Sequence, residues 1–428
     1  MKKHAFIILL LGCYFNASAQ TASSYEQDID ELYAVLQKTY SYKDQVRGEK
    51  QKDFNTLYKT LRADTAGTSD PFQRYYKLVR LFFSIRDNHL SFHQYPSIAF
   101  NKKQLDTASI ADRYRSASFF RNYPRAYLHL DSLEQVLKTR HADSAEGIYY
   151  YGSFLKIGLY RHAGSNEFTG VVLQSNLAAW EKGQIAMRLF EYRPNCFHAV
   201  YGHTEYKSLF LYANEKYRNG SLVNSFFYTT FSQHIYRKDT LTKDYVTIPR
   251  TEPDFVLRNI NTQTQYLRLG TFTAIPSAKM RVSDSFYTAI ENKLTAKHLI
   301  VDLRDNSGGA EKVSAKFFKL IRKFAKSGKV YVLVNNGTMS RGEIFTLQLM
   351  TVPNVTVYGQ TTKGTIAYGS NYGTVKRLPS GQYGVSITDM KDKEGYVQYE
   401  SYGVEPKVSL QNDGDWIEKI LQVISLEQ

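Results

Sequence analysis

The stretch that decides the fold begins at His298 and reads HLIVDLRDNSGGAEKVSAKFFKLIRKFAKSGKVYVLVNNGTMSRGEIF. It opens with an apolar run of strand length, 298–304, which ends in a turn that carries two glycines. A helical pattern follows over 310–325. The same order then repeats, with a second apolar run, a turn that ends at Ser340, and a helical pattern over 341–350. This alternation predicts βαβ units and a parallel sheet.

The two turns have the residues that an acyl-transfer site needs. In a parallel sheet, reacting groups lie beyond the carboxyl ends of the strands, and both turns belong there. Ser340, at a tight turn before a helix, would expose its hydroxyl, and the Arg341 N–H in the first helical turn is free to meet an oxyanion. Gly308 and Gly309 let a second backbone N–H approach closely. The simpler interpretation is an N-cap serine and an ordinary glycine turn.

These motifs resemble those of a known family. DLRDNSGG at 302–309 is similar to the strand and turn of the tail-specific (C-terminal-processing) serine proteases and the tricorn protease, and 337–345 resembles their nucleophile segment. Segments 357–362 and 402–406 resemble the next two landmarks, in the same order and at matching intervals. The resemblance covers 265–410 well and the N-terminal part more loosely. It implies a serine-type peptidase that requires no metal and no cofactor.

Members of this family differ in the residue that serves as the catalytic base. The best-known members use a Ser–Lys dyad, with the lysine in a Gly-x-x-Thr-x-Gly-Lys-Gly segment. Here that position holds Thr365, and Lys363 comes two residues early. In an extended segment a two-residue shift moves a side chain by about 6–7 Å. A base must come within roughly 2.6–3.2 Å of the hydroxyl, so Lys363 is our second-choice base.

Tricorn-like members instead use a histidine from the N-terminal part of the protease unit. His89, in RDNHLSFH, lies in a segment that resembles their Asp-Gly-His-Thr, and it is our first-choice base, with His93 as its rival. Glu400 falls where the tricorn protease has its acidic residue. The resemblance therefore implies a triad of Ser340, His89 and Glu400, in which Glu400 orients the histidine. The simpler interpretations are a structural histidine and a solvated carboxylate.

The expected fold class is a multidomain combination of α+β and α/β. We expect the chain to divide into four segments. They are a signal peptide at 1–19, an N-terminal helical region at 20–140, a small antiparallel β module at 141–255 and a tail-specific protease core at 256–428. The resemblance implies a crotonase-like αβ fold for that core. Many members of the family have a PDZ domain at this point in the chain, but the β module here lacks the Gly-Leu-Gly-type peptide-binding loop of such a domain. We therefore do not expect this protein to recognise C-terminal tails through a PDZ groove.

The N-terminus predicts export to the periplasm or the extracellular space. Two lysines precede an apolar run, and Ala17-Ser18-Ala19 fits a cleavage site. That run falls well short of the roughly 20 residues that span a bilayer. Cys13 offers the alternative of a lipid anchor. Cleavage would leave Cys196 as the only thiol, which excludes an intrachain disulfide, and we expect it in the core.

The net charge and the motifs of the sequence restrict the classes of molecule that we expect the protein to bind. The formal charge of +15 favours acidic partners, such as polyanionic envelope components. The sequence has no nucleic-acid motif, no cluster with metal-ligand spacing and no phosphate loop. We therefore predict an exported serine peptidase that cleaves a protein or peptide substrate through an acyl-enzyme, and leave the oligomeric state open. The alternative is a non-catalytic ligand- or peptide-binding protein on the same fold.

Overall fold

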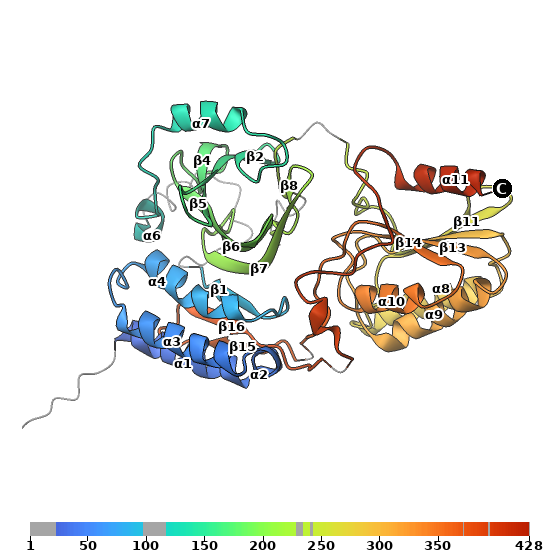
Figure 1. Cartoon of the computed structure of the whole chain (residues 1–428), viewed down its shortest axis with the longest axis horizontal. Coiled ribbons are helices and arrows are strands. Elements are labelled where there is room, and N and C mark those ends of the chain that lie inside the picture. Colours follow the sequence, from blue (N-terminus) through green and yellow to red (C-terminus); the bar gives the residue numbers. More distant parts are fainter. Residues whose placement is uncertain are drawn as a thin grey trace, which may run out of the picture.

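The computed structural model describes residues 23–96, 117–227, 234–239, 243–370, 372–392 and 394–427. Figure 1 shows two lobes. One lobe contains the N-terminal helices and an antiparallel barrel, and the other contains a sheet with helices on both faces. The predicted signal peptide and Cys13 lie outside the described residues.

The chain begins with four helices and a 3-10 helix that pack beside the barrel. These are α1 (Ser24–Lys38), α2 (Tyr40–Gln45), α3 (Glu49–Ala63), α4 (Pro71–Leu78) and η1 (Val79–Ser84). Ser23 and Glu26 form a capping box at the start of α1, with the Ser23 N–H donating to the Glu26 carboxylate at 2.7 Å. Asp70 caps α4 by accepting the Phe72 N–H at 2.8 Å.

An antiparallel barrel follows the helices. Its strands are β2 (Gly147–Tyr151), β3 (Leu155–Arg161), β4 (Glu167–Ser175), β5 (Ile185–Arg193), β6 (Cys196–Gly202), β7 (Leu209–Arg218), β8 (Ser221–Leu222) and β9 (Tyr236–Arg237). They follow the order β7-β6-β5-β4-β3-β2-β9-β8, and a further β7–β8 pairing closes the ring. Two short helices, α6 (Ser118–Arg121) and α7 (Leu130–Lys138), precede β2 in the chain. Closure leaves the barrel without an open edge there.

The sheet extends beyond the segment 141–255 that we predicted for it. Strand β1 (Ser91–Gln94) pairs with β7, and the hairpin of β15 (Val375–Arg377) and β16 (Tyr383–Ser386) pairs with β1. One of these additions comes from the N-terminal region and the other from within the predicted core. Alternation along a short strand indicates a strand but does not indicate its partner, so the sequence could not show this pairing.

The second lobe contains a six-stranded sheet. Its strands are β10 (Phe255–Asn259), β11 (Thr264–Leu269), β12 (His298–Asp302), β13 (Lys329–Val334), β14 (Val355–Gly359) and β17 (Val408–Ser409), in that spatial order. All neighbours pair in parallel except β10, which pairs antiparallel with β11. The predicted parallel strands of the 298–350 stretch are thus confirmed, and their carboxyl ends share one edge of the sheet.

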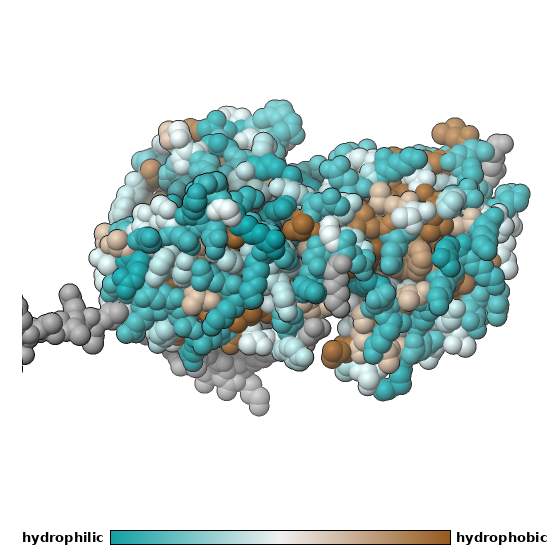
Figure 2. Space-filling view, turned by 60° about the horizontal axis from the view of Figure 1, so that its bottom comes forward, coloured by the Kyte–Doolittle hydropathy of each residue, from teal (hydrophilic) through white to brown (hydrophobic). Residues whose placement is uncertain are grey.

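Helices cover both faces of this sheet, which explains why its strands are apolar on both sides. The helices are α8 (Ser277–Ile290), α9 (Glu311–Phe324), α10 (Arg341–Met350) and α11 (Trp416–Leu426). Alternate residues divide between two cores: Val330 and Val332 pack with α9 and α10, while Tyr331 and Leu333 pack with Trp416 of α11. Buried parallel strands read as continuous apolar runs for this reason. Figure 2 shows more apolar surface on this lobe than on the N-terminal lobe.

Candidate active site

Ser340 lies in a strained turn between β13 and α10. Its backbone has φ of +52° and ψ of −120°, which non-glycine residues rarely adopt. Such strain persists only where the surroundings hold it, and it is common at functional sites. The Ser340 N–H donates to Oε2 of Glu343 at 2.9 Å. The residue is partly exposed, so its side chain is within reach of a ligand.

The glycine turn after β12 packs directly against Ser340. Asn306 fixes this turn, because its amide donates to the Leu269 carbonyl at 2.7 Å and its oxygen accepts the Gly308 N–H at 2.9 Å. Gly308 has φ of +77°, and a β-carbon there would lie 2.8 Å from Ser340 Cβ and 3.0 Å from the Arg341 nitrogen. The missing side chain therefore keeps open the space in front of the Arg341 N–H.

Two backbone N–H groups beside this space have no acceptor among the residues that the structure describes. They belong to Arg341 and Gly309. The Gly308 N–H, our other predicted oxyanion donor, is occupied by Asn306. The Gly309 turn is itself held by β-type bonding to Phe272, with the Ala310 N–H donating to the Phe272 carbonyl at 2.8 Å. Free donors next to an exposed hydroxyl can stabilise a developing oxyanion.

Glu343 ties the serine turn to the 361–365 loop. Its carboxylate is fully buried and accepts four hydrogen bonds, from the Ser340 N–H at 2.9 Å, the Thr362 hydroxyl at 2.6 Å, and the N–H groups of Gly364 at 2.7 Å and Thr365 at 2.9 Å. Burial raises the pKa of Glu343, while these bonds to the charged form lower it. Glu343 thus positions two segments of the site at once.

The barrel lobe holds the same loop through one face of β7. Three alternate side chains, Asn214, Lys216 and Arg218, form what we call the β7 clamp. The Asn214 amide donates to the Lys363 carbonyl at 3.0 Å, and Arg218 donates to the Thr361 carbonyl at 2.9 Å. The buried Lys216 ammonium donates to the carbonyls of Lys363 at 2.9 Å, Thr362 at 3.3 Å and Tyr402 at 3.3 Å. Side chains at i, i+2 and i+4 share one face of a strand, as here.

His89 lies in the turn between η1 and β1. Its backbone N–H donates to Oδ1 of the buried Asp87 at 3.1 Å. Burial, together with the positive charge of Lys363, lowers the pKa of His89 from 6.5 to about 4. The Nδ1 atom of His89 is buried and has no hydrogen-bond partner among the described residues. The imidazole is therefore neutral near pH 7.

Glu400 contacts the backbone beside His89. One oxygen accepts the Asn88 N–H at 2.7 Å, and the other accepts the N–H groups of Ile366 at 2.8 Å and Ala367 at 2.9 Å. The carboxylate is fully buried, and burial together with the charge of Asp87 raises the pKa of Glu400 to about 8. Glu400 thus fixes the peptide that leads into His89, and no direct hydrogen bond to the imidazole is present in the described structure.

Asn88 is a site residue that sequence reasoning did not single out. Its amide nitrogen donates to the Gly364 carbonyl, which joins the His89 turn to the 361–365 loop. Its Oδ1 atom is buried and unpartnered, like Nδ1 of the adjacent His89. Its place directly before the candidate histidine was the only available signal.

The two candidate bases are close enough to influence each other. The Lys363 charge contributes to lowering the pKa of His89. Burial lowers the pKa of Lys363 itself, and the carboxylates of Glu215 and Glu343 offset only part of that effect. Thr365, which occupies the dyad-lysine position, has a buried hydroxyl without a partner and gives its N–H to Glu343. His93, the rival histidine, lies on β1 and pairs across to Gly384 of β16.

Comparisons with known proteins identify this lobe. Residues 311–410 match the family model described as Peptidase family S41. The similarity to peptidase family S41 is therefore shown for this segment of the chain. The matched segment contains Ser340, Lys363 and Glu400, whereas His89 precedes it. No curated protein sequence matches the chain.

Several solved structures are similar to the chain at low identity. The C-terminal processing protease of photosystem II has 16% identity and a TM-score of 0.37, with 94% of this chain and 97% of that chain covered. A putative peptidase from Parabacteroides merdae has 14% identity and a TM-score of 0.37, covering 94% and 96%. The tricorn protease has 13% identity and a TM-score of 0.40, covering 94% of this chain and 37% of that chain. Similarity at this level carries no information on activity.

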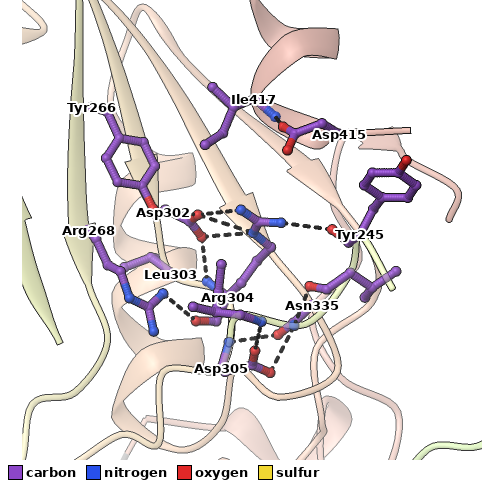
Figure 3. Close-up of polar contacts among 12 residues, drawn as sticks. Tyr245, Tyr266, Arg268, Asp302, Leu303, Arg304, Asp305, Asn335, Asp415 and Ile417 are labelled. Atoms are coloured by element: carbon purple, nitrogen blue, oxygen red, sulfur yellow. Dashed lines mark hydrogen bonds and ion pairs between the residues drawn. The ribbon is translucent and has the colours of Figure 1, made fainter. Parts of the chain in front are cut away.

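A buried polar network supports the strand ends next to the S41 domain's serine turn (Figure 3). Asp302 and Arg304 form an ion pair at 2.7 Å, with exposed side-chain fractions of 0% and 6%. Arg304 also donates to the Tyr245 carbonyl at 2.9 Å. Asp305 accepts from the Asn335 amide at 2.9 Å. The turns after β12 and β13 are thereby linked to each other and to the interlobe segment.

Three further findings concern ions, thiols and membranes. Among the described residues, no group of three or more His, Cys, Asp or Glu side chains is arranged to hold a metal ion. Cys196 is buried in β6 and is a free thiol. Within the described ranges, none of the helices combines the length and apolar character needed to cross a membrane.

Proposed function

We propose that this protein is an exported serine peptidase whose nucleophile is Ser340. One observation carries the proposal: a partly exposed serine occupies a strained turn beside two backbone N–H groups that have no acceptor among the described residues. This arrangement supports attack by Oγ on a peptide carbonyl, with the N–H groups of Arg341 and Gly309 binding the oxyanion. Export rests on the sequence of residues 1–19, and the substrate is a protein or peptide.

His89 is the proposed general base. It takes the Ser340 hydroxyl proton as Oγ bonds to the carbonyl carbon, and it returns that proton to the leaving amine when the C–N bond breaks. Water then attacks the acyl-enzyme with His89 again as base, which frees the acid product and restores the serine. A neutral imidazole at pH 7 supports this role, and it follows from the lowered pKa of His89.

Glu400 is proposed as a positioning residue that acts on His89 through Asn88. It holds the Asn88 N–H at 2.7 Å. The Asn88 oxygen and the His89 Nδ1 belong to neighbouring residues, and both are buried without a partner among the described residues, so a hydrogen bond between them would satisfy both. That contact would fix the Nδ1–H tautomer and leave Nε2 to face the serine.

The test is labelling of the mature protein with a fluorophosphonate probe. We expect labelling of the wild type and complete loss in Ser340→Ala and His89→Ala, because one removes the nucleophile and the other its base. Ser327→Ala and His141→Ala are matched controls at exposed positions and should label as the wild type does. Loss in Lys363→Ala with retention in His89→Ala would assign the base to Lys363. Failure of the folded wild type to label would favour the non-catalytic binding protein.

The pH dependence of labelling distinguishes the two bases. The folded protein lowers the pKa of His89 to about 4, so the neutral base persists well below pH 6.5. We expect the labelling rate constant to stay level from about pH 8 to 5 and to fall to half near pH 4, with circular dichroism confirming the fold at each pH. A lysine base must lose its proton, so a rate that climbs with pH above neutrality would contradict His89 as base.

A further inference from the structure

A cavity of about 670 Å³ lies where the two lobes meet. The barrel lobe contributes residues of β7 and β8, the interlobe segment contributes 244–251, and the S41 lobe contributes the turns after β12 and β13 together with Lys363. This volume is within the range of small-ligand and peptide pockets. The cavity extends to Gly337, three residues before Ser340 in the chain, while Ser340 and His89 themselves are not among its lining residues.

The lining has an excess of positive charge. Its cations are Arg218, Arg237, Arg250 and Lys363, and its carboxylates are Asp244 and Asp305. Both carboxylates are already engaged. Asp244 pairs with Arg237, and Asp305 accepts the Ile248 N–H at 2.6 Å and the Asn335 amide at 2.9 Å. Lys363 therefore has no carboxylate of the lining to balance its charge.

Lys363 is the cation of the lining that lacks side-chain partners. Its ammonium makes no hydrogen bond and no ion pair with any described residue. The nearby carboxylates of Glu215 and Glu343 act on it only at a distance, because their oxygens accept from other groups. Lys363 is partly exposed, so its ammonium, which has three donors, is open to an acceptor. An acceptor that enters the cavity would satisfy it.

The same lysine links the cavity to the catalytic residues. Its backbone N–H donates to the Thr338 carbonyl at 3.0 Å, two residues before Ser340. Its positive charge lowers the pKa of the His89 imidazole. The Asn336 side chain, which also lines the cavity, is 8% exposed and has an unpartnered amide oxygen. A peptide in this cavity would therefore meet the Lys363 ammonium and, as an acceptor for its own N–H groups, the Asn336 amide oxygen.

We propose that this cavity binds a carboxylate group of the peptide substrate, with the Lys363 ammonium as its counter-ion. The inference rests on the proposed peptidase function and names a chemical class for its substrate. A bound carboxylate would offset the Lys363 charge, and His89 would become a stronger base as a result. A substrate of the right class would in this way increase the reactivity of the serine that cleaves it.

The test is a binding measurement on full-length Ser340→Ala protein, in which turnover cannot occur. Three dye-labelled peptides share one apolar sequence: one with a free C-terminus, one amidated with a single aspartate, and one amidated without any carboxylate. We expect the neutral peptide to bind at least about tenfold more weakly than one of the other two in fluorescence anisotropy. The two charged peptides distinguish a chain end from an acidic side chain as the source of the carboxylate.

Substitutions of Lys363 test whether this residue causes the preference for peptides that carry a carboxylate. In the Ser340→Ala background, Lys363→Met should abolish the preference, Lys363→Arg should retain part of it, and Lys326→Met, at an exposed position after α9, should leave it intact. Equal affinity for all three peptides would overturn the proposal whether or not the variants fold. So would a carboxylate preference that survives in a folded Lys363→Met protein. Failure of the peptidase function itself is detected separately, as wild-type protein that does not react with the fluorophosphonate.

Discussion

Glu343→Gln is expected to lower both the stability of the protein and the reactivity of Ser340. The glutamine keeps the shape of the side chain but replaces one oxygen with a donor. Each oxygen of the Glu343 carboxylate accepts at least one backbone N–H. Whichever way the glutamine amide is turned, its NH₂ group therefore faces a backbone N–H, and two donors meet. An orphaned buried donor costs about 1–3 kcal/mol. Part of this cost is offset, because the neutral amide avoids burying a charge.

We expect a net loss of about 1–2 kcal/mol in the free energy of unfolding and a labelling rate at least about 100-fold lower. The second effect follows because the serine turn is strained and Glu343 holds its N–H in place. Urea denaturation and fluorophosphonate kinetics measure the two quantities. Glu311→Gln is the control: Glu311 opens the neighbouring helix α9, its side chain is 74% exposed, and its contact with Arg341 contributes little. Wild-type stability in Glu343→Gln would refute the positioning role.

Gly308→Ala should abolish most of the activity because its methyl group would enter the proposed oxyanion site. The added carbon would lie 2.8 Å from the Met339 carbonyl oxygen, 2.8 Å from Ser340 Cβ and 3.0 Å from the Arg341 nitrogen. Two of these three atoms belong to the backbone and cannot move aside cheaply. Loss of one oxyanion donor costs about 100- to 1000-fold in rate, and we expect a loss of at least that size.

Gly395→Ala separates the two effects of this substitution. Gly395 has the same φ of +77°, but a β-carbon there meets nothing within 4 Å. Its alanine variant therefore carries the backbone strain of about 1–2 kcal/mol without blocking the site. We expect near-normal hydrolysis of a peptide substrate by Gly395→Ala and severe loss in Gly308→Ala. Similar rates in both variants would argue against an oxyanion site beside Gly308.

The sequence predicted those features that arise from local pattern. Continuous apolar runs with intervening helical periods indicated the parallel strands of 298–350, and the helix 341–350 has the predicted bounds. Gly308 could be recognised as a turn residue because the chain needs a positive φ and a close approach there. Such properties depend on residues only a few positions apart.

Features that depend on distant partners could not be predicted in this way. The pairing of β1 with β7 and β16 joins three separate segments, and nothing in their alternation names the partner. The contact of Glu400 with Asn88 is of the same kind, and so is the role of Lys216. Asn214, Lys216 and Arg218 alternate along β7, but nothing in the sequence indicated that their side chains hold the 361–365 loop.

The interleaved sheet has a consequence for how this protein can be divided. Strand β16 lies within the S41 segment of the chain yet pairs with β1 of the N-terminal lobe, and the β7 clamp holds the 361–365 loop from outside that segment. A fragment that starts at β10 would therefore contain the serine but lack the partners of its own hairpin and loop. A continuous segment of the sequence is therefore not an independent structural unit here, and the proposed peptidase site depends on both lobes of the molecule.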